Sequence, residues 1–178
     1  MDHDLLQLYD TASGWTASKV AKAKAALDAP TPCDDWDVRT LLNHMLDTQR
    51  YFVASARGEE ASPPAPNPPD VLGSDPVADF ERARAETMSV FGEPGVIDKT
   101  GPSLGIAFSD QLLHGWDLAT ATGQDAEMPE GLPEAAYELI HGAFTEEQRV
   151  GIFQPEVDPG PNPSAQDRLL AYTGRPPG

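Results

Sequence analysis

Apolar side chains recur three and four residues apart along most of this chain, and this period constrains the fold more than any other feature. The first such segment spans about residues 4 to 27, with apolar groups at Leu5, Leu8, Tyr9, Ala12, Trp15 and Val20. Positions with this spacing share one face of an α-helix, whereas a half-buried strand needs alternation with period two, which no segment sustains for long. The chain is therefore predicted to be all-α.

Caps and helix breakers delimit the next two predicted helices. Asp37 is a suitable N-cap for a second helix that closes near Gly58. A third helix follows Asp75 and Pro76, because proline fits the first turn of a helix, and the segment from Gly92 to Gly95 stops it.

The second half of the chain predicts three more helices. Residues 101–123 form the most apolar one, and a fifth helix begins near Pro133, with the polar sequence TEEQ at 145–148 marking its end. The sequence SAQD places Ser164 three residues before Asp167, the spacing of a capping box, and so predicts a short final helix.

The length of 178 residues predicts one domain covering 1–178. Residues 61–75 begin with five prolines within ten residues, so they form a proline-rich loop between helices. Residues 154–178 are interpreted as a C-terminal extension. The expected architecture is a bundle of four main helices with a short extra C-terminal helix and proline-rich loops.

The charge balance limits the possible partners. With 29 acidic and 12 basic residues the formal net charge is −17, which disfavours nucleic acid and anionic membranes as partners because both are negatively charged. No apolar run is long enough to span a bilayer, and the N-terminal sequence MDHDLLQLYD lacks the features of a signal peptide. We therefore expect a cytoplasmic protein.

Three polar residues lie along one stripe of the otherwise apolar fourth helix. Asp110 and His114 are four residues apart, and Asp117 follows three residues later. His44 lies at the edge of the apolar face of the second helix, and side chains of facing helices meet in the core of a bundle. Two imidazoles and one carboxylate would make a three-ligand site for zinc or non-haem iron with one position open.

The same residues have simpler explanations, and on spacing alone these are the more common arrangement. His44 can be a half-buried histidine with satisfied hydrogen bonds, and Asp110 with His114 can be an intrahelical pair worth about 0.2–0.5 kcal/mol. Asp117 can accept the second ring N–H of a ligand histidine as an outer partner, or it can be a local cap. Both possibilities stay open at this stage.

Other residues suggest weaker candidates. Cys33 is the single cysteine and has no basic neighbour in sequence, so a packed small apolar residue is favoured over a nucleophile. Trp36 and Trp116 are expected to anchor the core. His141 is a reserve ligand, and His3 is expected to be solvated.

Three sequence motifs resemble a known family. TPCDDWDVRTLLNHML at 31–46 resembles a T-P-C-x-x-W-x-x-x-x-L-x-x-H segment of the mycothiol-dependent maleylpyruvate isomerase N-terminal family, a branch of the DinB-like metal-binding bundles. DQLLHGWDLATATG at 110–123 is similar to its second motif. The ending AQDRLLAYTGRPP at 165–177 is similar to that of a short stand-alone actinobacterial group within the family.

The resemblance implies a DinB-like four-helix bundle that binds a divalent metal ion through His44, Asp110 and His114. Zn²⁺ is the ion usually assigned, with Ni²⁺ or Fe²⁺ as alternatives. The isomerase has a glutamate where this chain has Asp110. The chain also stops before the second domain of the isomerase, so the isomerisation of maleylpyruvate itself is not carried over.

The function implied by the resemblance is a metal-dependent thiol transferase or isomerase. A mycothiol-type thiol would be the co-substrate and a small electrophile the second partner. One alternative is a non-catalytic protein with a structural or regulatory ion, and a second is a metal-assisted hydrolase. The sequence leaves the oligomeric state open, with a homodimer as one possibility.

Overall fold

The computed structural model describes residues 4–177, so the expectation for His3 lies outside the described residues. Within this range the chain forms eight helices and no extended strand, which confirms the all-α prediction. The chain divides into two compact units, one ending at Glu127 and one beginning at Met128. The single-domain assignment stays a prediction. None of the described helices combines the length and apolar character needed to cross a membrane.

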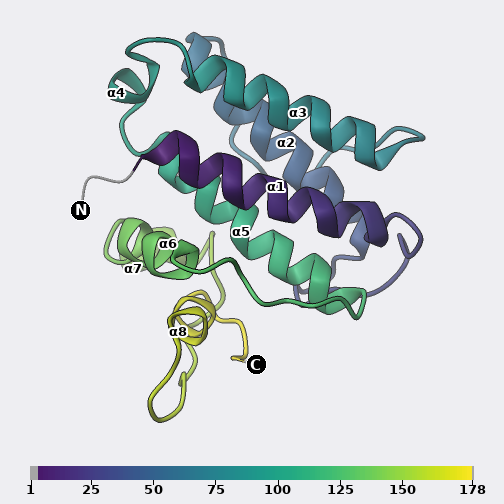
Figure 1. Cartoon of the computed structure of the whole chain (residues 1–178), viewed down its shortest axis with the longest axis vertical. Helices are drawn as coiled ribbons and strands as arrows, with labels where there is room; N and C mark the ends of the chain where they lie inside the picture. Colours follow the sequence, from purple (N-terminus) through teal and green to yellow (C-terminus); the bar gives the residue numbers. More distant parts are fainter. Residues whose placement is uncertain (1–3, 178) are drawn as a thin grey trace. The chain divides into compact units, whose positions relative to one another are not determined.

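The first unit is a four-helix bundle, as predicted. Its long helices are α1 (Leu5–Ala23), α2 (Val38–Arg57), α3 (Pro76–Phe91) and α5 (Ser103–Ala121), with the short helix α4 (Val96–Thr100) between the last two. Helix α1 packs against α3 and α5, and α2 packs against the same two helices (Figure 1). This arrangement places one face of α2 directly against α5.

The predicted caps define α2 and α3 in the structure. The carboxylate of Asp37 accepts a hydrogen bond from the backbone N–H of Thr40 at 2.8 Å, and Gly58 ends α2 in the left-handed conformation with φ 77°. Asp75 caps α3 in the same way through the backbone N–H of Ala78. Helix α1 ends at Ala23, a few residues earlier than the sequence predicts, because turns carry the chain from there to Pro30.

The bundle core is apolar and is built around α2. Its buried side chains come from all four long helices and include Val20, Leu41, Leu42, Met45, Phe80 and Leu118. Burial of this apolar surface is the main favourable contribution to folding of the bundle. The core therefore fixes the rotation of α2 and α5 about their axes, and with it the direction of the polar side chains at their contact.

Helix α5 approaches α1 so closely that only glycine fits at position 115. A Cβ atom there would meet the Thr16 hydroxyl, and it would lie 2.6 Å from Cζ3 of Trp15. The Thr16 hydroxyl also donates a hydrogen bond to the backbone carbonyl of Gln111 at 2.8 Å. This close contact sets the depth of α5 within the bundle.

The second unit contains the helices α6 (Leu132–Ile140), α7 (Glu146–Arg149) and α8 (Ala165–Tyr172). Helices α6 and α8 pack against each other. Helix α8 begins with the predicted capping box, in which Ser164 and Asp167 bond reciprocally to each other's backbone N–H.

The prediction for the end of the fifth helix is wrong. Helix α6 stops at Ile140, because His141 is extended and Gly142 adopts a left-handed conformation with φ 76°. The TEEQ sequence does not end this helix. It begins α7, where Thr145 and Gln148 form a second capping box.

Replacing Gly115 with alanine should lower the free energy of unfolding by about 1–2 kcal/mol, since overpacking against α1 outweighs the better helix propensity of alanine. Urea denaturation followed by circular dichroism measures this change. The exposed Thr120→Ala variant of the same helix is the control and should change stability by less than about 0.5 kcal/mol. A stabilised Gly115→Ala protein would contradict the packing described for α1 and α5.

Candidate metal centre

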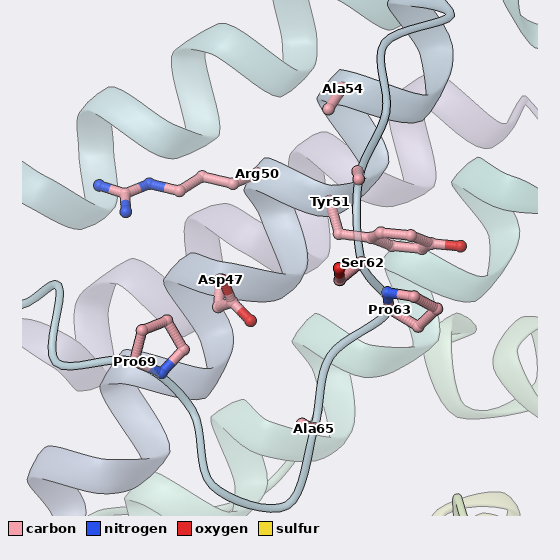
Figure 2. Close-up of a pocket in the computed structure, with 9 residues that line it drawn as sticks. Asp47, Arg50, Tyr51, Ala54, Ser62, Pro63, Ala65 and Pro69 are labelled. Carbon is pink, nitrogen blue, oxygen red and sulfur yellow. The ribbon is translucent and has the colours of Figure 1, made fainter.

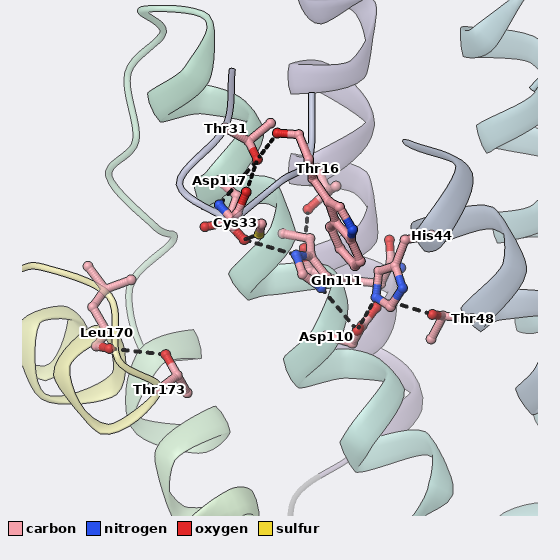
Figure 3. Close-up of polar contacts among 12 residues, drawn as sticks. Thr16, Thr31, Cys33, His44, Thr48, Asp110, Gln111, Asp117, Leu170 and Thr173 are labelled. Atoms are coloured by element: carbon pink, nitrogen blue, oxygen red, sulfur yellow. Dashed lines mark hydrogen bonds and ion pairs between the residues drawn. The ribbon is translucent and has the colours of Figure 1, made fainter. Parts of the chain in front are cut away.

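His44 of α2 meets Asp110 and His114 of α5 where the two helices pack together (Figure 3). The Asp110 Oδ1 atom lies 3.5 Å from His44 Nε2 and 3.4 Å from His114 Nε2. The two imidazole centroids are 4.8 Å apart. Only 12 to 18% of the surface of each of the three side chains is exposed, so the group is mostly shielded from water. The structure thus brings together the three residues that the sequence proposes as ligands.

The spacing of these atoms suits ion ligands better than hydrogen-bond partners. An N–H···O hydrogen bond normally spans about 2.7–3.2 Å, and both distances to Asp110 exceed this range. Nitrogen and oxygen ligands about 2.0–2.2 Å from one tetrahedral ion are separated from each other by about 3.3–3.6 Å. Asp110 Oδ2 and His44 Nδ1 are also buried without a hydrogen-bond partner among the described residues. The donor set therefore fits a divalent ion.

The electrostatics of the site favour an ionised carboxylate. Burial alone would raise the pKa of Asp110, but the charge of His114 and the close polar contacts with both histidines outweigh burial, so the pKa lies well below its usual value. Burial would lower the pKa of His114, yet Asp110 and Asp117 together hold it well above its usual value. The centre attracts positive charge, which a metal ion can supply in place of the proton.

Asp117 holds the other side of the His114 ring. Its side chain is fully buried, and its Oδ2 lies 2.9 Å from His114 Nδ1. An ionised carboxylate only accepts hydrogen bonds, so Nδ1 carries a proton, and when an ion takes the place of the second proton the lone pair of Nε2 is free to bind it. The structure places Asp117 where the sequence expects an outer partner, and its influence on a bound ion stays a prediction.

Cys33 contributes more than the sequence suggests. Its thiol packs against the apolar core, as expected, but it also donates a hydrogen bond to Asp117 Oδ2 at 3.3 Å. Cys33, Asp117 and His114 form a second group of ligand-type atoms. Cys33 and Asp117 are 84 positions apart in the sequence, which hides this contact from sequence analysis. Because Cys33 lies beside Nδ1 of His114, it belongs to a different group from His44.

Trp36 packs against the bundle core, as expected, and its indole also lies against the candidate site. The indole is half-buried, its centroid lies 4.7 Å from that of His44, and its N–H donates to the Pro66 carbonyl at 2.9 Å. Trp116 is buried, as expected. The reserve ligand His141 stacks on Tyr137 and belongs to neither ligand-type group found within residues 4–177.

Comparison with known proteins agrees with the motifs. The family model described as mycothiol maleylpyruvate isomerase N-terminal domain matches residues 11–119. The chain is 30% identical to the uncharacterized proteins MT0763 and Rv0738 from two Mycobacterium tuberculosis strains, CDC 1551 / Oshkosh and H37Rv. Each alignment covers 97% of this chain and 98% of the relative. No solved structure matches the chain.

Replacing Asp117 with leucine should lower the free energy of unfolding of the metal-free protein by about 1–3 kcal/mol, because the donors on Cys33 and His114 lose their buried acceptor. Asp117→Asn is the matched control. It should lower the free energy of unfolding less, since its amide oxygen still accepts a hydrogen bond. Urea denaturation in the presence of a chelator measures both. If neither substitution changes the free energy of unfolding measurably, the carboxylate does not hold the His114 ring.

Proposed function

Because this chain belongs to the mycothiol maleylpyruvate isomerase N-terminal domain family, we propose that His44, Asp110 and His114 hold one divalent metal ion. The observation that carries this proposal is the convergence of two imidazole nitrogens on one carboxylate oxygen at 3.4 and 3.5 Å. Zn²⁺ suits nitrogen and oxygen ligands of this kind, and Ni²⁺ and Fe²⁺ accept the same donors.

The aspartate at position 110 is compatible with this role. It has one methylene group fewer than the glutamate of the isomerase, which shortens the reach of its carboxylate. In the structure a single oxygen of Asp110 nevertheless lies at similar distances from both histidines. The close packing of α5 against α1 at Gly115 sets the position of this helix, so the shorter side chain meets α2.

We further propose that the centre serves a metal-dependent thiol transferase or isomerase. The group contains three protein ligands, which is typical of catalytic sites that keep a position open, whereas structural zinc sites have four. A divalent ion with an open position lowers the pKa of a bound thiol and so supplies a thiolate at neutral pH. The co-substrates would be a low-molecular-weight thiol of the mycothiol type and a small electrophile.

The protein's own residues would prepare the site for this chemistry. Asp117 keeps the proton on Nδ1 of His114 and so directs Nε2 toward the ion position. Asp110 supplies one negative charge to balance the ion. Trp36 lies over the His44 ring and limits the access of water from that side. Cys33 hydrogen-bonds to Asp117, so the protein's own thiol does not occupy the open position.

Asp110→Asn should weaken Zn²⁺ binding by at least about tenfold, because it removes the only anionic ligand of the set while conserving shape. Isothermal titration on protein freed of metal measures the affinity, and circular dichroism checks that the variant remains helical. Asp98→Asn, on the short helix α4, is the control and should bind like the unmodified protein. Unchanged affinity of folded Asp110→Asn protein would remove the carboxylate from the ligand set.

The two histidines test whether the motifs of α2 and α5 share one ion. His44→Ala and His114→Ala should each abolish tight Zn²⁺ binding, and the double variant should lose little more, since ligands of one ion act as a unit. His141→Ala, in the second unit, is the matched control and should retain affinity. If folded His44→Ala protein binds Zn²⁺ at full strength, His44 is a satisfied core histidine and the three-ligand centre is wrong.

A further inference from the structure

A cleft lies between α2 and the proline-rich segment that follows it (Figure 2). Its volume is about 390 Å³, within the range of ~300–1,000 Å³ that is usual for small-molecule sites. The residues that line it include Asp47, Tyr51 and Ala54 from the helix and Ser62, Pro63 and Ala65 from the segment. The cleft is therefore large enough for a small ligand.

The cleft adjoins the proposed metal centre along α2. Asp47 and Tyr51 follow His44 by three and seven positions, so the three side chains lie on one stripe of the helix. Thr48, one turn after His44, has its hydroxyl 3.4 Å from His44 Nε2. Trp36 contacts His44 and is hydrogen-bonded to Pro66 of the proline-rich segment. The metal centre and the cleft thus share one helix face and one covering segment.

The polar chemistry of the cleft is dominated by one carboxylate. Asp47 is half-buried, and its carboxylate makes no hydrogen bond or ion pair with any other side chain or backbone group of residues 4–177. Arg50 also borders the cleft, but its side chain extends away from Tyr51 and Ser62 (Figure 2), and its charge acts on Asp79. A ligand would therefore meet apolar proline and tyrosine surface together with an uncompensated negative charge.

We propose that this cleft selects ligands for the metal centre by charge, accepting small molecules whose cationic group pairs with Asp47 and rejecting carboxylate-bearing ones. The inference rests on the proposed metal site and adds the class of molecule that reaches it. A half-buried pair of opposite charges about 6 Å apart changes affinity by about tenfold at an intermediate effective dielectric constant. Like charges at that distance disfavour binding by a similar factor.

The test uses Co²⁺-loaded protein and three small thiols. Cysteamine, 2-mercaptoethanol and 3-mercaptopropionate carry a positive, a neutral and a negative group on similar two-carbon chains. Binding of each thiolate to Co²⁺ is followed by its charge-transfer absorption. The thiols differ in intrinsic acidity, so the quantity compared between protein variants is the ratio of dissociation constants for 3-mercaptopropionate and cysteamine.

Asp47→Asn should reduce this ratio by about a hundredfold, because the amide neither attracts the ammonium group nor repels the carboxylate and each effect contributes about tenfold. The affinity for 2-mercaptoethanol should not change. Asp98→Asn again serves as control and should leave the ratio as it is in the unmodified protein. Circular dichroism verifies that both variants are folded.

The outcomes separate this inference from the function on which it rests. If Co²⁺ and 2-mercaptoethanol bind but the ratio is the same in Asp47→Asn and unmodified protein, charge selection by the cleft is wrong and the metal site stands. If the unmodified protein takes up no Co²⁺, the metal site and the cleft's role are both wrong.

Discussion

A carboxylate buried between two imidazoles is the interaction on which the proposed function depends. Taking the charge of Asp110 out of water costs several kcal/mol unless partners compensate for it. His44 and His114 supply part of that compensation. They lower the pKa of Asp110 and so keep its carboxylate ionised. The apolar packing of α2 with α5 holds the three groups at distances that suit a shared cation. Apolar residues at these three positions would stabilise the bundle equally well, so stability alone does not account for the buried charge.

The surroundings of this centre come from segments outside the long helices. Cys33 and Trp36 lie in the turn before α2, and one reaches Asp117 while the other covers His44. The indole of Trp36 also hydrogen-bonds to Pro66, so the proline-rich segment is attached at the same place. The cleft with Asp47 then continues along α2 beneath that segment. The turn, the helix face and the proline-rich segment together define what can approach the proposed ion.

Local signals in the sequence are sufficient for the long helices and for part of the site, but not for the short helices α4 and α7. The caps at Asp37 and Ser164 predict where helices begin, because each satisfies orphan backbone groups within a few residues. The spacing of Asp110 and His114 predicts that they share a helix face. The partnership with His44 depends on how two distant helices pack, so spacing alone leaves it open and the family motifs favour it. Cys33 was underestimated for the same reason, since its partner is remote in sequence.

X-ray absorption at the zinc edge of Zn²⁺-loaded protein, measured without added thiol, tests the central claim most directly. Scattering from imidazole rings and light-atom ligands at about 2.0–2.2 Å, with no sulfur at about 2.3 Å, is the result that the His44, Asp110 and His114 centre predicts. Added 2-mercaptoethanol should then introduce one sulfur neighbour. A sulfur ligand in the thiol-free sample would instead place the ion at Cys33, and a shell of oxygen atoms alone would place it on the acidic surface. Either spectrum would contradict the proposed centre.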